Sequence, residues 1–448
     1  MKMKLWDKGY IPDQQIEKFT IGKDNELDLQ LAPFDVLGSI AHVKMLAKIG
    51  LLTGEESVKL IQSLRDVYRQ ILKGDFSIDE GIEDIHSQVE MMLTAELGES
   101  GKKVHAGRSR NDQVLLDLRL YLRERIEQLT LKQRELFNLL ISLSEQHKDK
   151  LMPGYTHTQL AMPSSFGLWL GAFAESLTDD TQLLLNAYHL VNRNPLGSGA
   201  GYGSSFPLDR EYTTQLLGFE SLSHNVIYAQ MGRGKMEWIV STAMASAAST
   251  LGKLAGDAIL FMNQHFGFIA FPDELTTGSS IMPHKKNPDV FELIRARCSK
   301  LQSLPNEITL IKNNLMSGYH RDYQLLKESL FPSFDELISC MDMMVVMLSN
   351  MQVKKDLLED SFYDYLFSVE EVNKLVLRGI PFREAYQEVA AAIQEGRFKP
   401  EKKVEHTHAG SIGNLNNDKI AADMEKIIDE FNFPATARAL EKLLIIKE

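Results

Sequence analysis

Apolar side chains recur at helical spacing over most of this chain, and this pattern predicts long helices. Four stretches keep the period with few helix-breaking residues: 112–148, 164–191, 233–262 and 288–312. A further periodic stretch covers residues 334–350. The pattern therefore predicts an all-α fold built on a bundle of long helices.

Two of these stretches are rich in small residues, which let neighbouring helix backbones approach closely. They are Gly167, Gly171, Ala172 and Ala174 in the first, and Ala243, Ala245, Ala247, Ala248, Gly252, Ala255 and Gly256 in the second. Helices that pack on several sides are typical of a core shared between subunits, so we expect an oligomer.

Shorter periodic segments lie on both sides of the bundle, after an irregular arm predicted for residues 1–30. They predict helices over 33–52, 53–72, 79–97, 368–378 and 383–395. Because 448 residues exceed one ordinary hydrophobic core, we predict more than one domain. The predicted division is an N-terminal helical domain of residues 1–105, a central bundle of 106–355 and a small C-terminal helical domain of 356–448.

Composition narrows the class of protein. With 44% hydrophobic and 25% charged residues, the chain is typical of a soluble globular protein. A net charge of -12 argues against a general nucleic-acid binder, which needs a basic face. Cys298 and Cys340 are too few for a disulfide framework or a metal cluster. Because signal-peptide and membrane-spanning patterns are both missing, we expect a cytoplasmic protein without membrane or nucleic-acid partners.

Polar chemistry is concentrated in the connections between helices, above all in residues 276–288. A Gly-Ser-Ser turn is followed there by a histidine and two lysines, then by Asn287 and Pro288. We predict that Asn287 caps the next helix and that Pro288 begins it. A flexible loop with lysines beside a helix start suits closure over an anionic substrate. A solvated basic loop is the alternative interpretation.

Two more connections carry candidate chemistry. Residues 105–113 include Arg108 and Arg110 near a helix start, where arginines can hold carboxylates, although they could also face water. Residues 153–159 are predicted to form a turn followed by a helix, with His157 near its start. A single histidine in such a place is more often structural than catalytic.

Of the remaining connections, one is a candidate for substrate binding and the other does not match a known cofactor-binding motif. Residues 317–324 form another polar cluster, and Lys327 follows closely. Residues 196–205 are rich in glycine but lack the spacing of a phosphate loop or a dinucleotide-binding fingerprint, so no cofactor is predicted there.

Three of these segments resemble a known family. Residues 278–288, Gly-Ser-Ser-Ile-Met-Pro-His-Lys-Lys-Asn-Pro, resemble the signature of the fumarase/aspartase superfamily. Residues 105–113 and 154–159 are similar to the other motif regions of one of its families, the argininosuccinate lyases. The likeness extends over about residues 17–395. The segment 107–113, Gly-Arg-Ser-Arg-Asn-Asp-Gln, favours this family over fumarase, aspartase and adenylosuccinate lyase.

The resemblance implies a fold and an activity. The implied fold is all-α with three domains, and the central bundles of four chains form the twenty-helix core of a homotetramer. Each active site would take its motifs from three subunits. The implied activity is that of a carbon–nitrogen lyase, the reversible anti elimination of argininosuccinate to arginine and fumarate in arginine biosynthesis. No cofactor or metal is expected, because protein cations and hydrogen-bond donors stabilise the carbanion.

The resemblance also assigns catalytic roles. Lys285 and Asn287 match residues suited to stabilising the carbanion beside the substrate carboxylate. Ser279 and His157 match the general base and the general acid, in either assignment, and we favour Ser279 as the base. Glu292, thirteen residues after Ser279, would make His157 more basic if the two were paired.

Other positions match the family's substrate-binding residues. They are Thr20, Asp84, His86, Ser109, Arg110, Asn111, Thr156, Asn287, Tyr319, Gln324 and Lys327. Thr20 stands where the family has a serine, and the match at Asp84 and His86 is a short Asp-x-His pattern.

The chain departs from the family's pattern in four places. Residues 6–10 replace a Trp-Gly-Gly-Arg-Phe run, and residues 221–230 lack a Ser-Asp-Arg-Asp run. Leu325 and Leu326 stand where an acidic pair is usual, and His284 where glutamine is common. These changes concern the arginine end of the substrate, so a lyase for an N-acylated argininosuccinate is one alternative.

Two further alternatives are another lyase of the same superfamily and a non-enzymatic protein of the same fold. Adenylosuccinate lyase activity is disfavoured by the segment 107–113 and by the absence of net basic character for a nucleotide. A crystallin-like structural protein would be expected to lack an acid or base position. The candidate residues His157, Ser279, Lys285 and Glu292 are all present.

Overall fold

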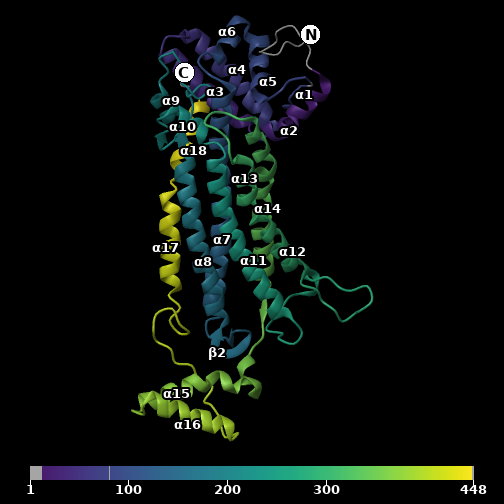
Figure 1. Cartoon of the computed structure of the whole chain (residues 1–448), viewed down its shortest axis with the longest axis vertical. Helices are drawn as coiled ribbons and strands as arrows, with labels where there is room; N and C mark the ends of the chain where they lie inside the picture. Colours follow the sequence, from purple (N-terminus) through teal and green to yellow (C-terminus); the bar gives the residue numbers. More distant parts are fainter. Residues whose placement is uncertain (1–12, 80, 446–448) are drawn as a thin grey trace.

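Long helices run along the long axis of the molecule, as the hydrophobic period predicts. The computed structural model describes residues 13–79 and 81–445. Its bundle consists of α7 (Arg110–Gln146), α8 (Phe166–Val191), α11 (Lys235–Met262) and α14 (Leu326–Ser349), which run side by side in Figure 1. Their apolar sides form one continuous hydrophobic core. The prediction of an all-α fold is confirmed.

The small residues predicted to allow close packing do so where α8 begins. Gly167 lies so near the end of α7 that a Cβ atom there would be 2.5 Å from the Cα atom of Lys148. The hydroxyl of Ser144 donates to the carbonyl oxygen of Gly167 at 2.7 Å. Because any larger side chain would push the two helices apart, glycine at this position fixes their spacing.

The N-terminal helices gather at one end of the bundle (Figure 1). They are α1 (Gln14–Ile21), α2 (Asp24–Asp28), α3 (Ala32–Lys48), α4 (Gly54–Lys73), α5 (Ile85–Leu97), α6 (Glu99–Lys102) and the 3₁₀ turn η1 (Lys103–His105). The prediction of an irregular arm is therefore wrong for the part that the structure describes. The helix predicted over 79–97 begins only at Ile85, because Asp84 caps it and Gly81 adopts a φ of 81°.

The connection between α7 and α8 is a β-hairpin and not the predicted turn and helix. Strand β1 (Leu151–Thr156) pairs antiparallel with β2 (Gln159–Ser165), and Thr156 lies opposite Gln159. His157 and Thr158 form the tip, with φ angles of 51° and 61°. Positive φ at both central residues is the geometry of a two-residue hairpin turn, although glycine and asparagine usually supply it.

Two other short strand pairs brace the connections. Strand β3 (Arg193–Asn194) pairs parallel with β4 (Ser221–Leu222), and β5 (Ile269–Ala270) pairs antiparallel with β6 (Gln352–Val353). The short helical segments between the longer helices are α9 (Arg210–Leu216), α10 (Val226–Met231), η2 (Asp273–Leu275) and η3 (Arg321–Leu325).

The helix predicted over 288–312 is broken in two. Helices α12 (Asp289–Leu301) and α13 (Leu304–Lys312) are separated at residues 302–303, and Pro305 lies in the first turn of α13. Proline favours the start of a helix and disfavours its interior, which explains the break. The predicted cap is also wrong, because α12 begins at Asp289 and no side chain caps it.

The C-terminal segments pack in two places. The helices α15 (Ser368–Leu377) and α16 (Phe382–Gln394) share a small core of Val372, Ala385 and Val389. The turns η4 (Leu357–Glu359) and η5 (Ser361–Phe367) lead into them, and α17 (Asn417–Glu430) and α18 (Phe433–Leu444) follow.

The last two helices return to the bundle. Helix α17 lies along α7 and α8, whereas α18 packs against α3 and α9 at the N-terminal end (Figure 1). The domain boundaries after residues 105 and 355 stay predictions. Within residues 13–79 and 81–445, no helix has the length and apolar character needed to cross a membrane.

Candidate active site

The structure divides the predicted site residues into three groups. The first belongs to the N-terminal helices, the start of α7, the connection that leads into α14 and the first turn of that helix, and it contains Thr20, Asp84, His86, Ser109, Arg110, Asn111, Tyr319, Gln324 and Lys327. The second is the segment before and within α12, with Ser279, Lys285, Asn287 and Glu292. The third is the hairpin tip, with Thr156 and His157. No hydrogen bond or ion pair among the described residues joins one group to another.

Arg110 is the centre of the first group. It is the first residue of α7, and its Nη1 lies 3.0 Å from Glu83 and 3.2 Å from Asp84. Its Nη2 donates to the hydroxyl of Ser87 at 2.6 Å. Arg321 adds a second cation on Glu83 at 3.0 Å. The guanidinium groups are thus held at the surface of the N-terminal end, where they can meet a carboxylate of a substrate.

A capping box holds the start of α7 in place. The hydroxyl of Ser109 accepts a hydrogen bond from the backbone N–H of Asn111, and Asp112 accepts one from the backbone N–H of Ser109. The second oxygen of Asp112 accepts from Gly197 and Gly199 at 3.0 and 2.9 Å. This buried carboxylate therefore joins the predicted binding segment to the glycine-rich connection.

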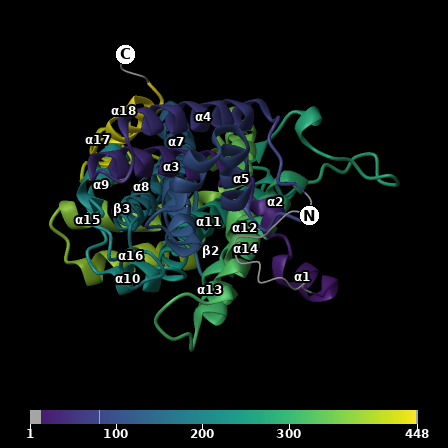
Figure 2. The same ribbon diagram turned by 90° about the horizontal axis from the view of Figure 1, so that it is seen from above.

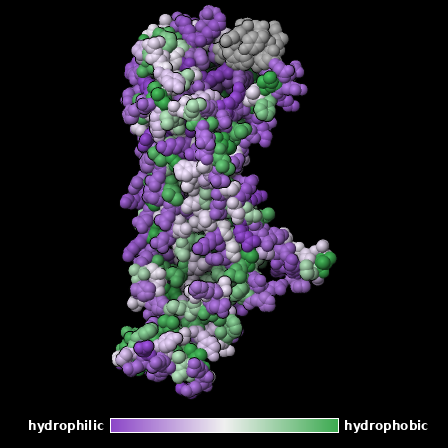
Figure 3. All heavy atoms as spheres, viewed as in Figure 1, coloured by the Kyte–Doolittle hydropathy of each residue, from purple (hydrophilic) through white to green (hydrophobic). Residues whose placement is uncertain are grey.

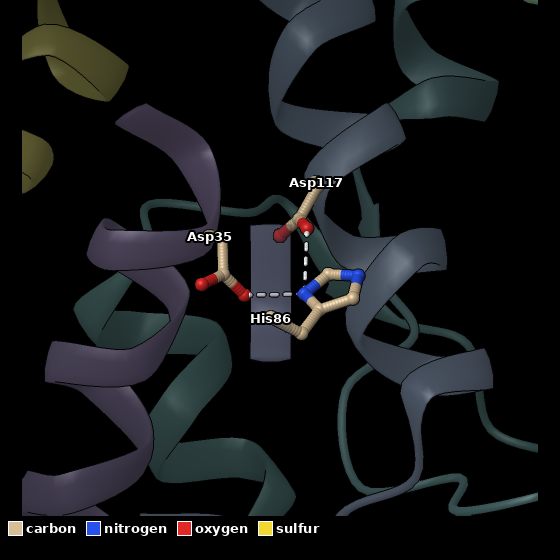
Figure 4. Close-up of side chains that lie close together, drawn as sticks. All are labelled: Asp35, His86 and Asp117. Atoms are coloured by element: carbon tan, nitrogen blue, oxygen red, sulfur yellow. Dashed lines mark hydrogen bonds and ion pairs between the residues drawn. The ribbon is translucent and has the colours of Figure 1, made fainter. Parts of the chain in front are cut away.

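His86 is buried beneath this group and faces two carboxylates. Its Nδ1 lies 2.8 Å from Asp35 Oδ1 and 3.7 Å from Asp117 Oδ2, as Figure 4 shows. Burial alone would lower the pKa of His86, but Asp35, Asp117 and Asp84 raise it to about 10. The ring is therefore a cation enclosed by acids, and its predicted contact with substrate stays a prediction.

The ligand atoms of Asp35, His86 and Asp117 all lie within 4.8 Å of one another, a spacing that a metal ion would accept. A metal ligand must be a neutral imidazole, whereas the raised pKa keeps this ring protonated. Arg108, which is partly exposed, contributes a second positive charge to the group and donates to Ser39 Oγ at 2.9 Å. The cluster therefore fits a buried ion network better than a metal centre.

Lys327 and Gln324 are occupied by the N-terminal segment. Lys327 lies 2.6 Å from Asp24 and 2.5 Å from Asp28, both on α2. The side-chain amide of Gln324 donates to the carbonyl oxygens of Thr20 and Ile21 at 3.1 and 2.8 Å. Gln324 thus holds α1 against η3, and Lys327 holds α2 against α14; the substrate contacts of both residues stay predictions.

Apart from Glu292, which lies on α12, the second group lies on a loop that extends away from the bundle in both views (Figures 1 and 2). Asn287 closes it, because its backbone N–H donates to Thr277 at 2.8 Å and its side-chain amide donates to Gly278 at 3.3 Å. Lys286 forms an ion pair with Asp273.

Lys285 and Glu292 are exposed, and their side chains have no hydrogen-bond or ion-pair partner among the described residues. The tip of the loop is hydrophobic in Figure 3, and Ile281 is 82% exposed.

Ser279 has two donors close to its hydroxyl oxygen. The backbone N–H groups of Met282 and Ile281 point to its Oγ at 3.2 and 3.4 Å. Hydrogen bonds from amides favour the charged form of an oxygen acid, so this turn would stabilise a serine alkoxide.

The third group lies at the opposite end of the bundle from the N-terminal helices (Figure 1). His157 is exposed at the hairpin tip, and the hydroxyl of Thr158 donates to its carbonyl oxygen at 2.6 Å. The hairpin packs against η4, η5 and α8, and Tyr155 lies against Phe266 and Phe268. The predicted pairing of His157 with Glu292 does not occur within one chain.

The acidic partners of the predicted cations were not among the residues predicted from the sequence. Glu83 links Arg110 to Arg321, and Asp24 and Asp28 enclose Lys327. Burial raises the pKa of Asp24 to about 6, although the charge of Lys327 opposes that shift. The only signal in the sequence was the run of acids before α5 and within α2. A local pattern of that kind does not identify which distant cation each acid will meet.

The departures from the family's pattern fall mostly outside the three groups. Residues 6–10 lie outside the described residues. Residues 221–230 form β4 and α10, and Asn225 caps α10. Leu326 is buried and Leu325 is 50% exposed. His284 lies on the exposed loop of the second group.

Known proteins share this fold. The structure matches EDDS lyase in complex with formate with a TM-score of 0.77, over 97% of this chain and 95% of that chain, at 23% identity. It matches class II fumarase from Schistosoma mansoni with a TM-score of 0.68, over 92% of this chain and 95% of that chain, at 15% identity. The fold is therefore that of the fumarase/aspartase superfamily of lyases.

The sequence comparisons identify the family within that fold. A family model described as lyase matches residues 10–303. Over 444 residues, which are 99% of this chain and 100% of the relative, the chain is 59% identical to an argininosuccinate lyase from Parabacteroides distasonis. The chain belongs to the argininosuccinate lyase family.

Proposed function

We propose that this chain catalyses the reversible anti elimination that splits argininosuccinate into arginine and fumarate, as a step of arginine biosynthesis in the cytoplasm. The observation that carries this proposal is the 59% identity, over 99% of this chain, with a relative named argininosuccinate lyase. The motifs of the exposed loop and the hairpin tip support it, since they carry the residue types that such an elimination needs.

The elimination removes a proton from the carbon beside a carboxylate. Ser279 is the proposed base, because two backbone N–H groups near its oxygen would stabilise the alkoxide that takes this proton. The ammonium group of Lys285 and the amide of Asn287 would stabilise the negative charge that develops on the substrate carboxylate. Lys285 suits this role because no acid among the described residues neutralises it.

His157 is the proposed acid that protonates the departing guanidinium nitrogen. Its place at a two-residue turn presents the ring to solvent without covering side chains. The opposite assignment, with His157 as base and Ser279 as acid, remains the alternative for the two proton transfers.

A complete site requires more than one chain, since the three groups lie on separate parts of the molecule. We propose a homotetramer in which each active site combines groups from three subunits. Apolar side chains exposed along the bundle support this assembly. Leu131, Leu183, Leu260, Met343 and Val346, from four bundle helices, are each between 40% and 48% exposed. Such a surface is typical of a subunit interface.

The proposed reaction is tested by mixing the purified protein with argininosuccinate and following fumarate by its ultraviolet absorbance. The Ser279→Ala variant should lose at least about a hundredfold in kcat, because it lacks the proposed base. Lys286→Met is a matched control on the same loop, since Lys286 is paired with Asp273 and has no proposed role. Absence of fumarate with the unchanged protein would refute the proposal.

A further inference from the structure

A pocket of about 680 Å³ opens at the N-terminal end of the molecule, apart from all three groups of site residues. It lies between α3, α4, α9 and α18, where the last helix returns to the start of the fold. None of the predicted catalytic or substrate-binding residues lines it.

The charged residues that line this pocket are all cations. Lys44, Arg65, Arg438 and Lys442 contribute positive charge, and no aspartate or glutamate is among the lining residues. No ion pair joins any of the four to an acid of the described part of the chain. An unneutralised concentration of positive charge in a concave site attracts anions.

Arg65 is the most unusual of the four because it is almost completely buried. It is 4% exposed, and its Nη2 donates to the carbonyl oxygen of Leu443 at 3.0 Å. Its buried Nε has no hydrogen-bond partner among the described residues. A buried charge without a counter-charge costs free energy, which a bound anion would recover.

Buried arginines elsewhere in the described chain have better partners. Arg233 is paired with Glu237 at 2.9 Å. Arg123 donates to the side chain of Asn192 and to the carbonyl oxygens of Leu217 and Gly218. Arg65 therefore differs from these residues in having one carbonyl as its acceptor.

Lys44 adds a second, partly buried cation beside Arg65. Burial lowers the pKa of Lys44, and the charge of Arg65 lowers it further. An anion between the two side chains would relieve this repulsion.

Apart from Gln215, the other residues that line the pocket are apolar. Val58 and Ile445 line it and are 65% and 60% exposed, and Ile61 and Leu216 continue the same surface. The combination of a cationic floor and an apolar rim fits a ligand with a charged head and an aliphatic body.

We propose that this pocket binds a small organic anion with a carboxylate or phosphate head, which Arg65 and Lys44 hold, and a short aliphatic body, which Val58 and Ile445 cover. The site is separate from the proposed elimination reaction, and binding to it does not depend on that reaction.

The test is isothermal titration calorimetry of the full-length protein with hexanoate, hexyl phosphate, hexan-1-ol and inorganic phosphate. We expect one hexanoate or hexyl phosphate per chain, and the stronger of the two identifies the head group. Hexan-1-ol and inorganic phosphate should each bind at least about tenfold more weakly, because one lacks the charge and the other lacks the aliphatic body.

Variants place the binding in this pocket. Arg65→Met and Lys44→Met keep the aliphatic part of each side chain and should each weaken binding at least about tenfold. Lys59→Met, on the same helix as Arg65 but paired with Glu55 at 2.7 Å, is the matched control and should bind as the unchanged protein does. Arg438→Gln provides a variant at an exposed position, should the buried substitutions unfold the chain.

Three results would overturn the proposal. The first is no heat of binding with either hexyl anion at about 10 mM. The second is equal binding of hexan-1-ol, which would define an apolar pocket without charge selectivity. The third is unchanged binding in the Lys44→Met and Arg438→Gln variants, which would place the ligand elsewhere.

Discussion

His86 Nδ1 lies 2.8 Å from Asp35 Oδ1, in a part of the fold from which solvent is excluded (Figure 4). With Asp117, these side chains join α5, α3 and α7. Two residues before His86, Asp84 caps α5 and pairs with Arg110. Burial opposes the charged form of Asp84, but His86 and Arg110 lower its pKa. The buried histidine therefore positions the proposed substrate-binding end.

We predict that His86→Gln destabilises the fold by about 3–5 kcal/mol, because Asp35 and Asp117 would remain buried without the cation that lies closest to them. Urea unfolding measures the difference. His189→Gln is the matched control, since His189 pairs with Glu220 at 2.9 Å on the surface and should contribute no more than about 1 kcal/mol. Equal losses in the two variants would show that the buried charge carries no special stability.

The same cluster predicts a dependence of stability on pH. The pKa of His86 is about 10 in the folded chain and 6.5 for a free histidine, so the folded state binds the proton more tightly. The contribution of His86 is fully present below about pH 6.5 and is lost as the pH rises through about 10. The difference in unfolding free energy between the unchanged protein and His86→Gln should therefore shrink from pH 6.5 to pH 10. A constant or growing difference would contradict a protonated His86.

The long helices could be predicted from the sequence because their stability depends on a repeated local pattern. Helices α7, α8 and α11 lie within a few residues of the predicted ranges. The start of α4 is also predictable from the sequence, because Thr53 and Glu56, which form its capping box, lie within one turn. Pro305 is a local signal for the start of α13. The break before it was nevertheless not predicted, because the apolar period continues across both helices.

The site could be predicted only as a set of residues and not as a geometry. His157 was expected at the start of a helix, whereas pairing of Thr156 with Gln159 forces it into a turn without glycine or asparagine. The acids around His86 and Lys327 come from helices that are distant in the sequence, so local residue spacing does not predict these ion pairs. Tertiary packing overrides local preference in both cases.

Thr158 is predicted to hold the hairpin tip in a strained backbone conformation. A β-branched residue rarely adopts a φ of 61°, so Thr158→Gly should raise stability by about 0.5–1 kcal/mol, measured by thermal unfolding. The variant also loses the hydrogen bond to the His157 carbonyl oxygen, so kcat should fall by about tenfold as the histidine becomes less fixed. Gln159→Gly, in ordinary strand geometry, should instead lower stability. Lower stability in Thr158→Gly would contradict the strain at this position.

Separation of Ser279 and His157 within one chain predicts complementation between two inactive variants. Ser279→Ala and His157→Ala each remove one proposed proton-transfer group, and each alone should be inactive. If every site takes its loop and its hairpin from different subunits, random hybrid tetramers contain intact sites at about one quarter of positions. Coexpression of the two variants should therefore restore about a quarter of the activity, measured as fumarate formation. Coexpression of Ser279→Ala with Lys285→Met is the control, because both changes lie on one loop and no hybrid restores it. Activity in the control, or none in the first pair, would refute a site shared between subunits.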